Sequence, residues 1–327
     1  MEPVLHYYPD GIMGVDCRFV RAGLACAHVI IEAGRASVVD VGTAYSATEV
    51  AQALAKVQIP LEKVDYLFLT HVHLDHASGV GKFLELASQA KLVVHPLGAR
   101  HMVNPSRLIE ATIDIYGTKH VETHYGPILP VDSSRIIEAT DGFELDFNGR
   151  CLKFLDTPGH SRHHYCMVDV RSRSIFAGDT FGVSFREFDT DKGPFIFPTT
   201  SPAHFDLDAA HESIDRLMNF NPEYFYLMHY SRIPATPNLA LQLHEFLDVF
   251  ADFTFKVLDL EENREQTLYE NLMQFLLDRL QQHGSSLGLA QARELLEGDV
   301  RLNAQGLLVW AEAFKRRHGS KQNQGLG

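Results

Sequence analysis

The amino-acid sequence predicts a layered α/β (α+β) domain followed by a helical C-terminal extension. Over residues 1–234, short apolar runs alternate with amphipathic stretches and turn signals, which is typical of strands and helices arranged in layers. Strand signals vanish after Pro234, and residues 235–320 keep only helical periodicity. Residues 321–327 are polar and rich in glycine, so we expect them to be a disordered tail.

The strands are predicted from apolar runs that are bounded by turn residues. Gly34 and Arg35 separate the first two runs as a tight hairpin would. The predicted strands are residues 27–32, 37–41, 64–69, 91–95, 135–139, 151–156, 165–170, 174–177 and 224–228.

The helices are predicted from a period of 3.6 residues and from capping signals. Ser46 and Glu49 have the spacing of a capping box, which places the start of the first helix. The predicted helices of the first part are residues 46–57, 77–90, 96–103 and 205–220. Those of the extension are residues 239–253, 264–282, 289–296 and 304–317.

Composition and charge exclude several classes of partner. The chain has 327 residues with 45% hydrophobic residues, which is enough for a full core, and it lacks a run of about 18 apolar residues that could span a membrane. Its net charge of −13 opposes binding to nucleic acid or to an anionic membrane. The first residues, MEPVLHYYPDG, lack a basic region followed by an apolar one, so we expect a cytoplasmic location.

The segment THVHLDHASG, residues 70–79, carries four metal-competent side chains where the predicted strand 64–69 ends. In an extended segment, residues two apart point the same way, so His71 and His73 can bind one metal ion together. The chain must then turn into a helix. The turn directs Asp75 and His76 elsewhere, which suits a second metal.

Three later segments add one polar side chain each. His160 ends LDTPGH after a predicted strand, Asp179 lies in FAGDT after the next hairpin, and His229 ends YLMH after another strand. Together with the first segment they supply five histidines and two aspartates. The alternative is coincidence, but a string such as HxHxDH should arise by chance in only a few of about a thousand similar chains.

In this order of motifs the sequence resembles the metallo-β-lactamase-fold superfamily, and within it dinuclear hydrolases such as glyoxalase II and acyl-homoserine lactonases. The motifs that carry the resemblance are HxHxDH, TPGH, GDT and the late histidine, and they run from Ala25 to His229. The resemblance implies a four-layer αββα sandwich with a metal site at one edge, between the two sheets.

The resemblance also implies a role for each candidate residue. Metal ligands are expected at His71, His73 and His160 for the first ion, at Asp75, His76 and His229 for the second, and at Asp179 as a bridge between both. Asp40, in VVDVGT, is expected to accept a hydrogen bond from a ligand histidine; the alternative is a turn residue that caps the hairpin exit. His164 is expected to support the site or to pack beside it, and His163 to lie on the surface. The MHYS context of His229 departs from the Gly-His-Gly-like context that is common in the family.

Nitrogen and oxygen ligands suit two divalent ions, for which we expect Zn²⁺, with Fe or Mn²⁺ as alternatives. Two cations that share a water lower its pKa toward neutrality. The resemblance therefore implies a bridging hydroxide as the nucleophile, so that no serine or cysteine nucleophile is needed.

The long segment 180–204 is rich in phenylalanine and has little regular pattern. We expect it to form a lid or pocket wall, with an apolar part of the substrate against Phe181, Phe185, Phe188 and Phe195; the alternative is that these rings anchor the loop to the core. Residues 102–125 are expected to form another wall or a homodimer contact.

These features predict a dinuclear metal hydrolase of a small-molecule ester, thioester or lactone. One alternative is a di-iron protein of the same fold that binds or reduces O₂, although flavodiiron proteins usually carry glutamate at the position of His73. Another is a metal-bound regulatory or binding module that works through its helical C-terminal part.

Overall fold

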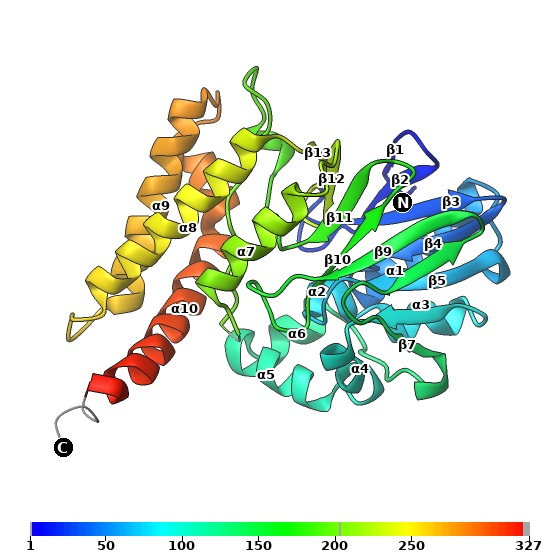
Figure 1. Ribbon diagram of the computed structural model, residues 1–327, viewed down its shortest axis with the longest axis horizontal. Coiled ribbons are helices and arrows are strands. Elements are labelled where there is room, and N and C mark those ends of the chain that lie inside the picture. Colours follow the sequence, from blue (N-terminus) through cyan, green and yellow to red (C-terminus); the bar gives the residue numbers. More distant parts are fainter. Residues whose placement is uncertain (1, 203, 323–327) are drawn as a thin grey trace.

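The computed structural model describes residues 2–202 and 204–322, with side chains up to residue 317. Two β-sheets pack face to face, and helices cover their outer faces (Figure 1). The first sheet has the order β1-β2-β3-β4-β5-β6-β7, with bounds Leu5–Tyr7, Ile12–Asp16, Cys26–Glu32, Arg35–Val39, Val64–Leu69, Lys91–Val94 and Ile136–Glu138. The second has the order β13-β12-β11-β10-β9-β8, and β8 to β13 span Glu144–Phe147, Arg150–Asp156, Tyr165–Asp169, Ser174–Gly178, Tyr224–Leu227 and Ser231–Pro234.

Helices connect the parallel strands of both sheets. Strands β4 to β7 are parallel, as are β11 and β12, whereas the other neighbours are antiparallel. Parallel neighbours need a crossover, and helices supply it. Helices α1 to α7 span Ala44–Lys56, Leu74–Ala77, Val80–Leu86, Pro96–Val103, Ser106–Tyr116, Thr118–His124 and Leu207–Met218. Helices α8, α9 and α10 span Pro237–Val257, Arg264–His283 and Leu289–Gln322.

Strand alternation divides the apolar side chains among three layers. Phe68 of β5 packs between the sheets, where it meets Phe154 of the second sheet. Its neighbours Leu67 and Leu69 point to the opposite face, against the helices that cover the first sheet. Because side chains alternate along a strand, a continuous apolar run such as VDYLFL can fill two layers at once. The result is the four-layer αββα sandwich that the family resemblance implies (Figure 1).

The helical C-terminal part shares a core with the outer face of the second sheet. Phe225 and Leu227 of β12 belong to one buried cluster with residues of α8, α9 and α10, including Phe246, Leu276 and Leu307. In Figure 1 these three helices form a bundle beside the second sheet, on the side where α7 also lies. None of the described helices has the length and apolar character needed to cross a bilayer.

The sequence prediction missed four short strands, β1, β2, β8 and β13. Strand β2 reads IMGVD, and its central Gly14 weakens the strand signal. The structure explains this glycine, since a Cβ atom there would lie 2.9 Å from Sγ of Cys26 on the paired strand. The four strands are only three to five residues long, too short for a clear period of two.

Helix boundaries also correct the sequence prediction. Helix α1 begins earlier than predicted, because Thr43 is the N-cap and shares a reciprocal capping box with Ser46; Ser46 is therefore not itself the cap. The segments predicted as two helices, 289–296 and 304–317, form the single helix α10, which continues to Gln322. Of the predicted disordered tail, residues 323–327 lie outside the described residues.

Candidate metal centre

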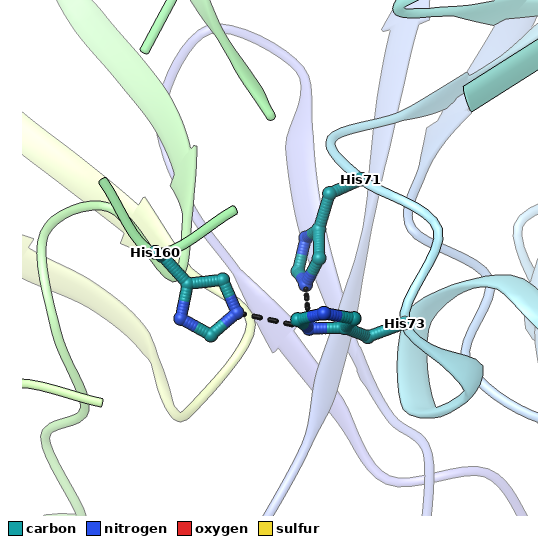
Figure 2. A group of neighbouring side chains, drawn as sticks. All are labelled: His71, His73 and His160. Carbon is teal, nitrogen blue, oxygen red and sulfur yellow. Dashed lines mark hydrogen bonds between the residues drawn. The ribbon is translucent and has the colours of Figure 1, made fainter. Parts of the chain in front are cut away.

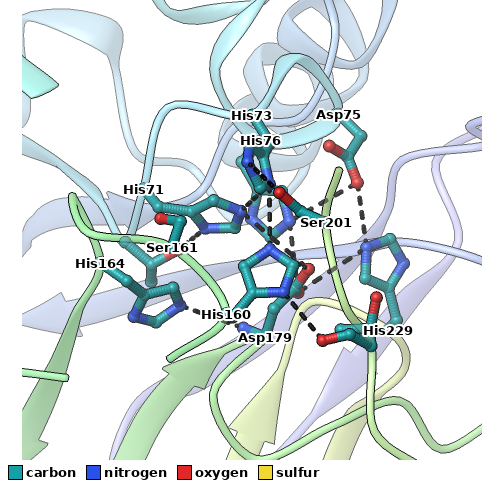
Figure 3. Close-up of polar contacts among 12 residues, drawn as sticks. His71, His73, Asp75, His76, His160, Ser161, His164, Asp179, Ser201 and His229 are labelled. Atoms are coloured by element: carbon teal, nitrogen blue, oxygen red, sulfur yellow. Dashed lines mark hydrogen bonds and ion pairs between the residues drawn. The ribbon is translucent and has the colours of Figure 1, made fainter. Parts of the chain in front are cut away.

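The seven predicted ligands meet at one end of the sandwich, where strands of both sheets end (Figure 3). His71 and His73 follow β5, and Asp75 and His76 lie in the short helix α2. The other three come from the second sheet: His160 from the β9–β10 connection, Asp179 directly after β11, and His229 from the β12–β13 connection. Segments more than 150 residues apart in the chain, such as those of Asp75 and His229, thus form one cluster.

Three histidines form a first potential metal site (Figure 2). Nδ1 of His73 lies 2.9 Å from Nε2 of His71 and 2.9 Å from Nε2 of His160. No placement of protons gives each of these three ring nitrogens a good hydrogen bond to the others. One cation, in contrast, can accept a lone pair from all three.

Asp75, His76 and His229 form a second potential site beside the first. Oδ2 of Asp75 lies 3.6 Å from Nε2 of His76 and 3.1 Å from Nε2 of His229. One carboxylate and two imidazoles are a common donor set for a first-row divalent metal.

Asp179 lies between the two groups, and its two oxygens face different partners (Figure 3). Oδ2 is 3.5 Å from Nε2 of His160 and 4.0 Å from Nε2 of His71, in the first group. Oδ1 is 3.3 Å from Nε2 of His76 and 3.9 Å from Nε2 of His229, in the second group. This is the placement that a carboxylate bridging two cations requires.

Two buried polar atoms at the centre support a metal between these side chains. Nε2 of His76 and Oδ1 of Asp179 are buried 3.3 Å from each other, and neither atom has the geometry of a hydrogen bond to any described residue. Leaving such atoms without a partner costs free energy, on the order of 1–3 kcal/mol each. Because both atoms point into the cluster, a bound cation would satisfy them together.

Asp40 orients His76 through Nδ1, the ring nitrogen that faces away from the cluster. Its carboxylate accepts hydrogen bonds from the backbone N–H of Thr70 at 2.8 Å and from the Thr70 hydroxyl at 2.7 Å. It also lies 3.0 Å from Nδ1 of His76. With the proton on Nδ1, the lone pair of Nε2 faces the cluster. Asp40 thus makes a contact with a candidate ligand histidine, as the family resemblance implies.

His164 supports Asp179 through the backbone rather than through the carboxylate. Its Nε2 accepts the backbone N–H of Asp179 at 3.2 Å, and its Nδ1 lies 3.0 Å from the Thr157 hydroxyl. The preceding Gly178 has a φ of 48°, and a Cβ atom there would lie 2.7 Å from Nε2 of His164. Glycine therefore permits the close approach that holds Asp179 in place.

Backbone carbonyls orient two further histidines of the cluster. Nδ1 of His160 lies 3.1 Å from the carbonyl of Thr199, and Nδ1 of His229 lies 2.9 Å from that of Leu24. Both contacts place the proton on Nδ1 and leave Nε2 free to bind a metal. The segment around Thr199 is in turn held by Asn303 of α10, a residue that sequence reasoning missed because no local pattern connects it to the site.

The two groups differ in their electrostatics. Burial and the neighbouring His160 lower the pKa of His73 to about 3, so this imidazole is neutral and ready to bind a cation. At His229 burial also lowers the pKa, but the carboxylates of Asp179 and Asp75 outweigh it and raise the pKa to about 9. A metal at the second group must therefore displace protons at neutral pH.

Two expectations about neighbouring residues need correction. His163 is buried rather than exposed, with its ring 5.6 Å from that of His73. The phenylalanines expected to line a substrate pocket are instead core residues: Phe181, Phe185, Phe188 and Phe195 are each at most 1% exposed and pack in the cluster beneath the C-terminal helices. Aromatic composition alone could not distinguish a pocket wall from a core.

Comparison with known proteins identifies the family of this chain. Residues 23–229 match the family model described as Metallo-beta-lactamase superfamily. The metallo-beta-lactamase fold-containing protein ST1585 of Sulfurisphaera tokodaii is 28% identical over 166 residues, which cover 50% of this chain and 59% of that protein. A hydroxyacylglutathione hydrolase of Francisella philomiragia is 25% identical over 118 residues, which cover 36% of this chain and 34% of the hydrolase. The chain thus spans less than two thirds of the length of these two relatives.

Solved structures share the fold over nearly the whole chain. The crystal structure of a metallo-beta-lactamase family protein from Thermus thermophilus superimposes with a TM-score of 0.64 at 20% identity. The alignment covers 97% of this chain and 93% of that chain. The similarity therefore includes the helical C-terminal part as well as the sandwich.

Proposed function

Because the chain belongs to the metallo-beta-lactamase superfamily, we propose that it is a hydrolase that holds two divalent cations and cleaves a small ester, thioester or lactone. The observation that carries the proposal is the position of Asp179, whose two oxygens face the first and the second histidine group separately. A relative named hydroxyacylglutathione hydrolase is consistent with a thioester as substrate.

The first cation would be held by the group of His71, His73 and His160, and the second by that of Asp75, His76 and His229, with Asp179 shared. When bound, the two cations would supply Lewis acidity that activates water and polarises a carbonyl group. Zn²⁺ is the ion we expect, with Fe or Mn²⁺ as alternatives that the donor atoms also accept.

The protein's own contribution is to position these groups. Asp40, Thr199 and Leu24 keep three imidazoles in the tautomer that binds metal. His164 holds the backbone of Asp179. These contacts hold the candidate ligands in place before a cation enters, which favours a preorganised centre.

The test is hydrolysis by the metal-loaded protein of three neutral substrates: S-acetyl-N-acetylcysteamine, p-nitrophenyl acetate and an N-acyl-homoserine lactone. We expect turnover of at least one, and its loss in the variant Asp179→Ala. The matched control is Asp191→Ala, which removes an exposed carboxylate in the loop after Asp179. Failure of all three substrates with the fully metal-loaded protein would contradict the proposal.

A further inference from the structure

A cavity of about 650 Å³ lies between α10, the segment before α7 and the loop that follows His160. Its volume is in the range of small-molecule sites. The side chains that determine its chemistry are Arg162, Phe205, Asp206, Trp310, Arg316 and Arg317.

The cavity is adjacent to the metal centre. Pro202 and His204 line it, and the hydroxyl of nearby Ser201 lies 3.5 Å from Nε2 of His73. The ring of His204 lies 6.2 Å from that of His163. Phe205 lines both this cavity and a narrow pocket that reaches His160 and Asp179. A ligand in the cavity would therefore extend naturally toward the predicted cations.

Three arginines surround this cavity in a chain whose net charge is −13. Arg162 lies in the loop after His160, whereas Arg316 and Arg317 come from α10. Within the described residues Arg162 forms no ion pair. The one lining carboxylate, Asp206, is the N-cap of α7 and accepts the backbone N–H of Ala209. Its charge is thus partly offset by the helix N-terminus.

The positive charges near the cavity also affect the pKa of a nearby histidine, His204. Burial lowers the pKa of His204, and the charges of Arg162 and Arg100 lower it further. A cationic neighbourhood disfavours a protonated imidazole and favours an anion.

Aromatic side chains form the apolar part of the cavity. Trp310 and Phe205 are 5% and 6% exposed, and their rings lie 5.8 Å apart. The guanidinium groups suit phosphates, because each can bind two phosphate oxygens at once, and the aromatic rings suit an apolar or planar group. The cavity therefore matches a ligand that carries both.

We propose that this cavity binds a phosphate-bearing end of the substrate, so that the compound hydrolysed is a thioester whose thiol part carries phosphates and a ring. The inference rests on the proposed function. The reaction adds water across the carbon–sulfur bond and releases a carboxylic acid and a thiol. It needs no further reactant.

Three acetyl thioesters share the same reacting bond but differ in the charge of the thiol part, so they test the effect of that charge by itself. Acetyl-coenzyme A carries phosphates, S-acetylglutathione carries carboxylates, and S-acetyl-N-acetylcysteamine is neutral. For Arg162→Gln and Arg316→Gln we expect kcat/KM for acetyl-coenzyme A to fall about tenfold, since each variant removes one charged hydrogen-bonding group. The value for the neutral thioester should stay within about twofold. The matched control is Arg173→Gln, which removes an exposed arginine paired with Glu223 outside the cavity.

A binding experiment tests the cavity without any reaction. Trp310 is the only tryptophan of the chain, so tryptophan fluorescence reports on the cavity directly. Titration of the metal-loaded protein with coenzyme A should give a saturable change, and its Kd should rise about tenfold in Arg162→Gln. Added salt should weaken this binding, because it screens the charges.

The outcomes distinguish the two proposals. Saturable binding of coenzyme A without hydrolysis of any ester, thioester or lactone contradicts the proposed function and supports the cavity assignment. No fluorescence change with coenzyme A overturns the cavity assignment, whatever is hydrolysed. The cavity assignment would also be overturned if the arginine variants lowered kcat/KM for S-acetylglutathione alone. The same holds if they lowered it for the neutral thioester as much as for acetyl-coenzyme A.

Discussion

Asn303 of α10 and Thr200 are joined by a buried hydrogen bond in which the Oδ1 atom of Asn303 accepts the backbone N–H of Thr200 at 2.6 Å. The Nδ2 atom of Asn303 donates to the carbonyl of Pro198 at 3.0 Å. Between these two contacts lies Thr199, whose carbonyl orients His160. The C-terminal helix thus sets the direction of a predicted metal ligand from outside the sandwich.

The variant Asn303→Ala should weaken the first metal site. Without the amide, the segment around Thr199 loses its anchor, and loss of such a supporting contact typically lowers metal affinity by about 10–100-fold. Competition with a chelator measures the affinity. The control Asn238→Ala changes an exposed asparagine at the start of α8 and should have no effect. Equal affinities for Asn303→Ala and the unaltered protein would show that Asn303 only packs.

Asp179→Ala should release at least the second cation. Asp179 is the candidate bridge because its two oxygens face different groups, so its loss removes a donor from each. We expect about two metals per chain in the unaltered protein and about one or fewer in the variant, by elemental analysis. The same analysis identifies the metal. Full metal content in Asp179→Ala would rule out the bridge.

The two sites should respond differently to pH. In the metal-free chain the pKa of His229 is raised to about 9, so below that pH a proton occupies the second site and competes with the metal. Affinity there should rise about tenfold per pH unit for each proton displaced, up to about pH 9. The pKa of His73 is about 3, so this residue imposes no such dependence on the first site above neutral pH. Stepwise calorimetric titrations at pH 6.5, 7.5 and 8.5 measure the metal affinity of both sites. The same change of affinity with pH at the two sites would contradict this prediction.

Arg150→Ala should strongly destabilise the fold. Arg150 and Asp169 form a fully buried ion pair with Nε 3.0 Å from Oδ1, and Arg150 also donates to the carbonyl of Asp10 at 2.6 Å. Removing one partner leaves a buried charge, at a cost of about 3–5 kcal/mol in the free energy of unfolding. Urea denaturation measures it. Arg171→Ala breaks an ion pair whose arginine is 46% exposed and should cost less than about 1 kcal/mol.

Phe195→Ala distinguishes the core role from a role in substrate binding. Phe195 is 1% exposed and packs against Phe246 of α8. A buried phenylalanine replaced by alanine typically costs about 3–5 kcal/mol of stability. We expect that loss in thermal or urea unfolding, with KM for small thioesters unchanged at a temperature where the variant is folded. A raised KM without loss of stability would restore the pocket-wall interpretation.

Local spacing was enough to predict that candidate metal ligands lie together in residues 71–76. His71 and His73 are two residues apart in extended chain, so they point the same way wherever the segment lies, and Asp75 and His76 follow in the short helix α2. The layered fold was also predictable, because runs such as VDYLFL fill two apolar layers. The short strands and the start of α1 were not, since three to five residues hold too little periodic signal.

The sequence by itself determined which side chains could bind metal and that they follow strands of a layered domain, because residue type and spacing are local properties. Only the tertiary structure decided that α10 anchors the loop beside His160, that Phe195 is core, and that arginines distant in sequence surround one cavity. Those relationships join residues about 50 or more positions apart, such as Phe195 and Phe246 or Thr200 and Asn303. Chain packing creates such contacts, and no periodicity in the sequence encodes them.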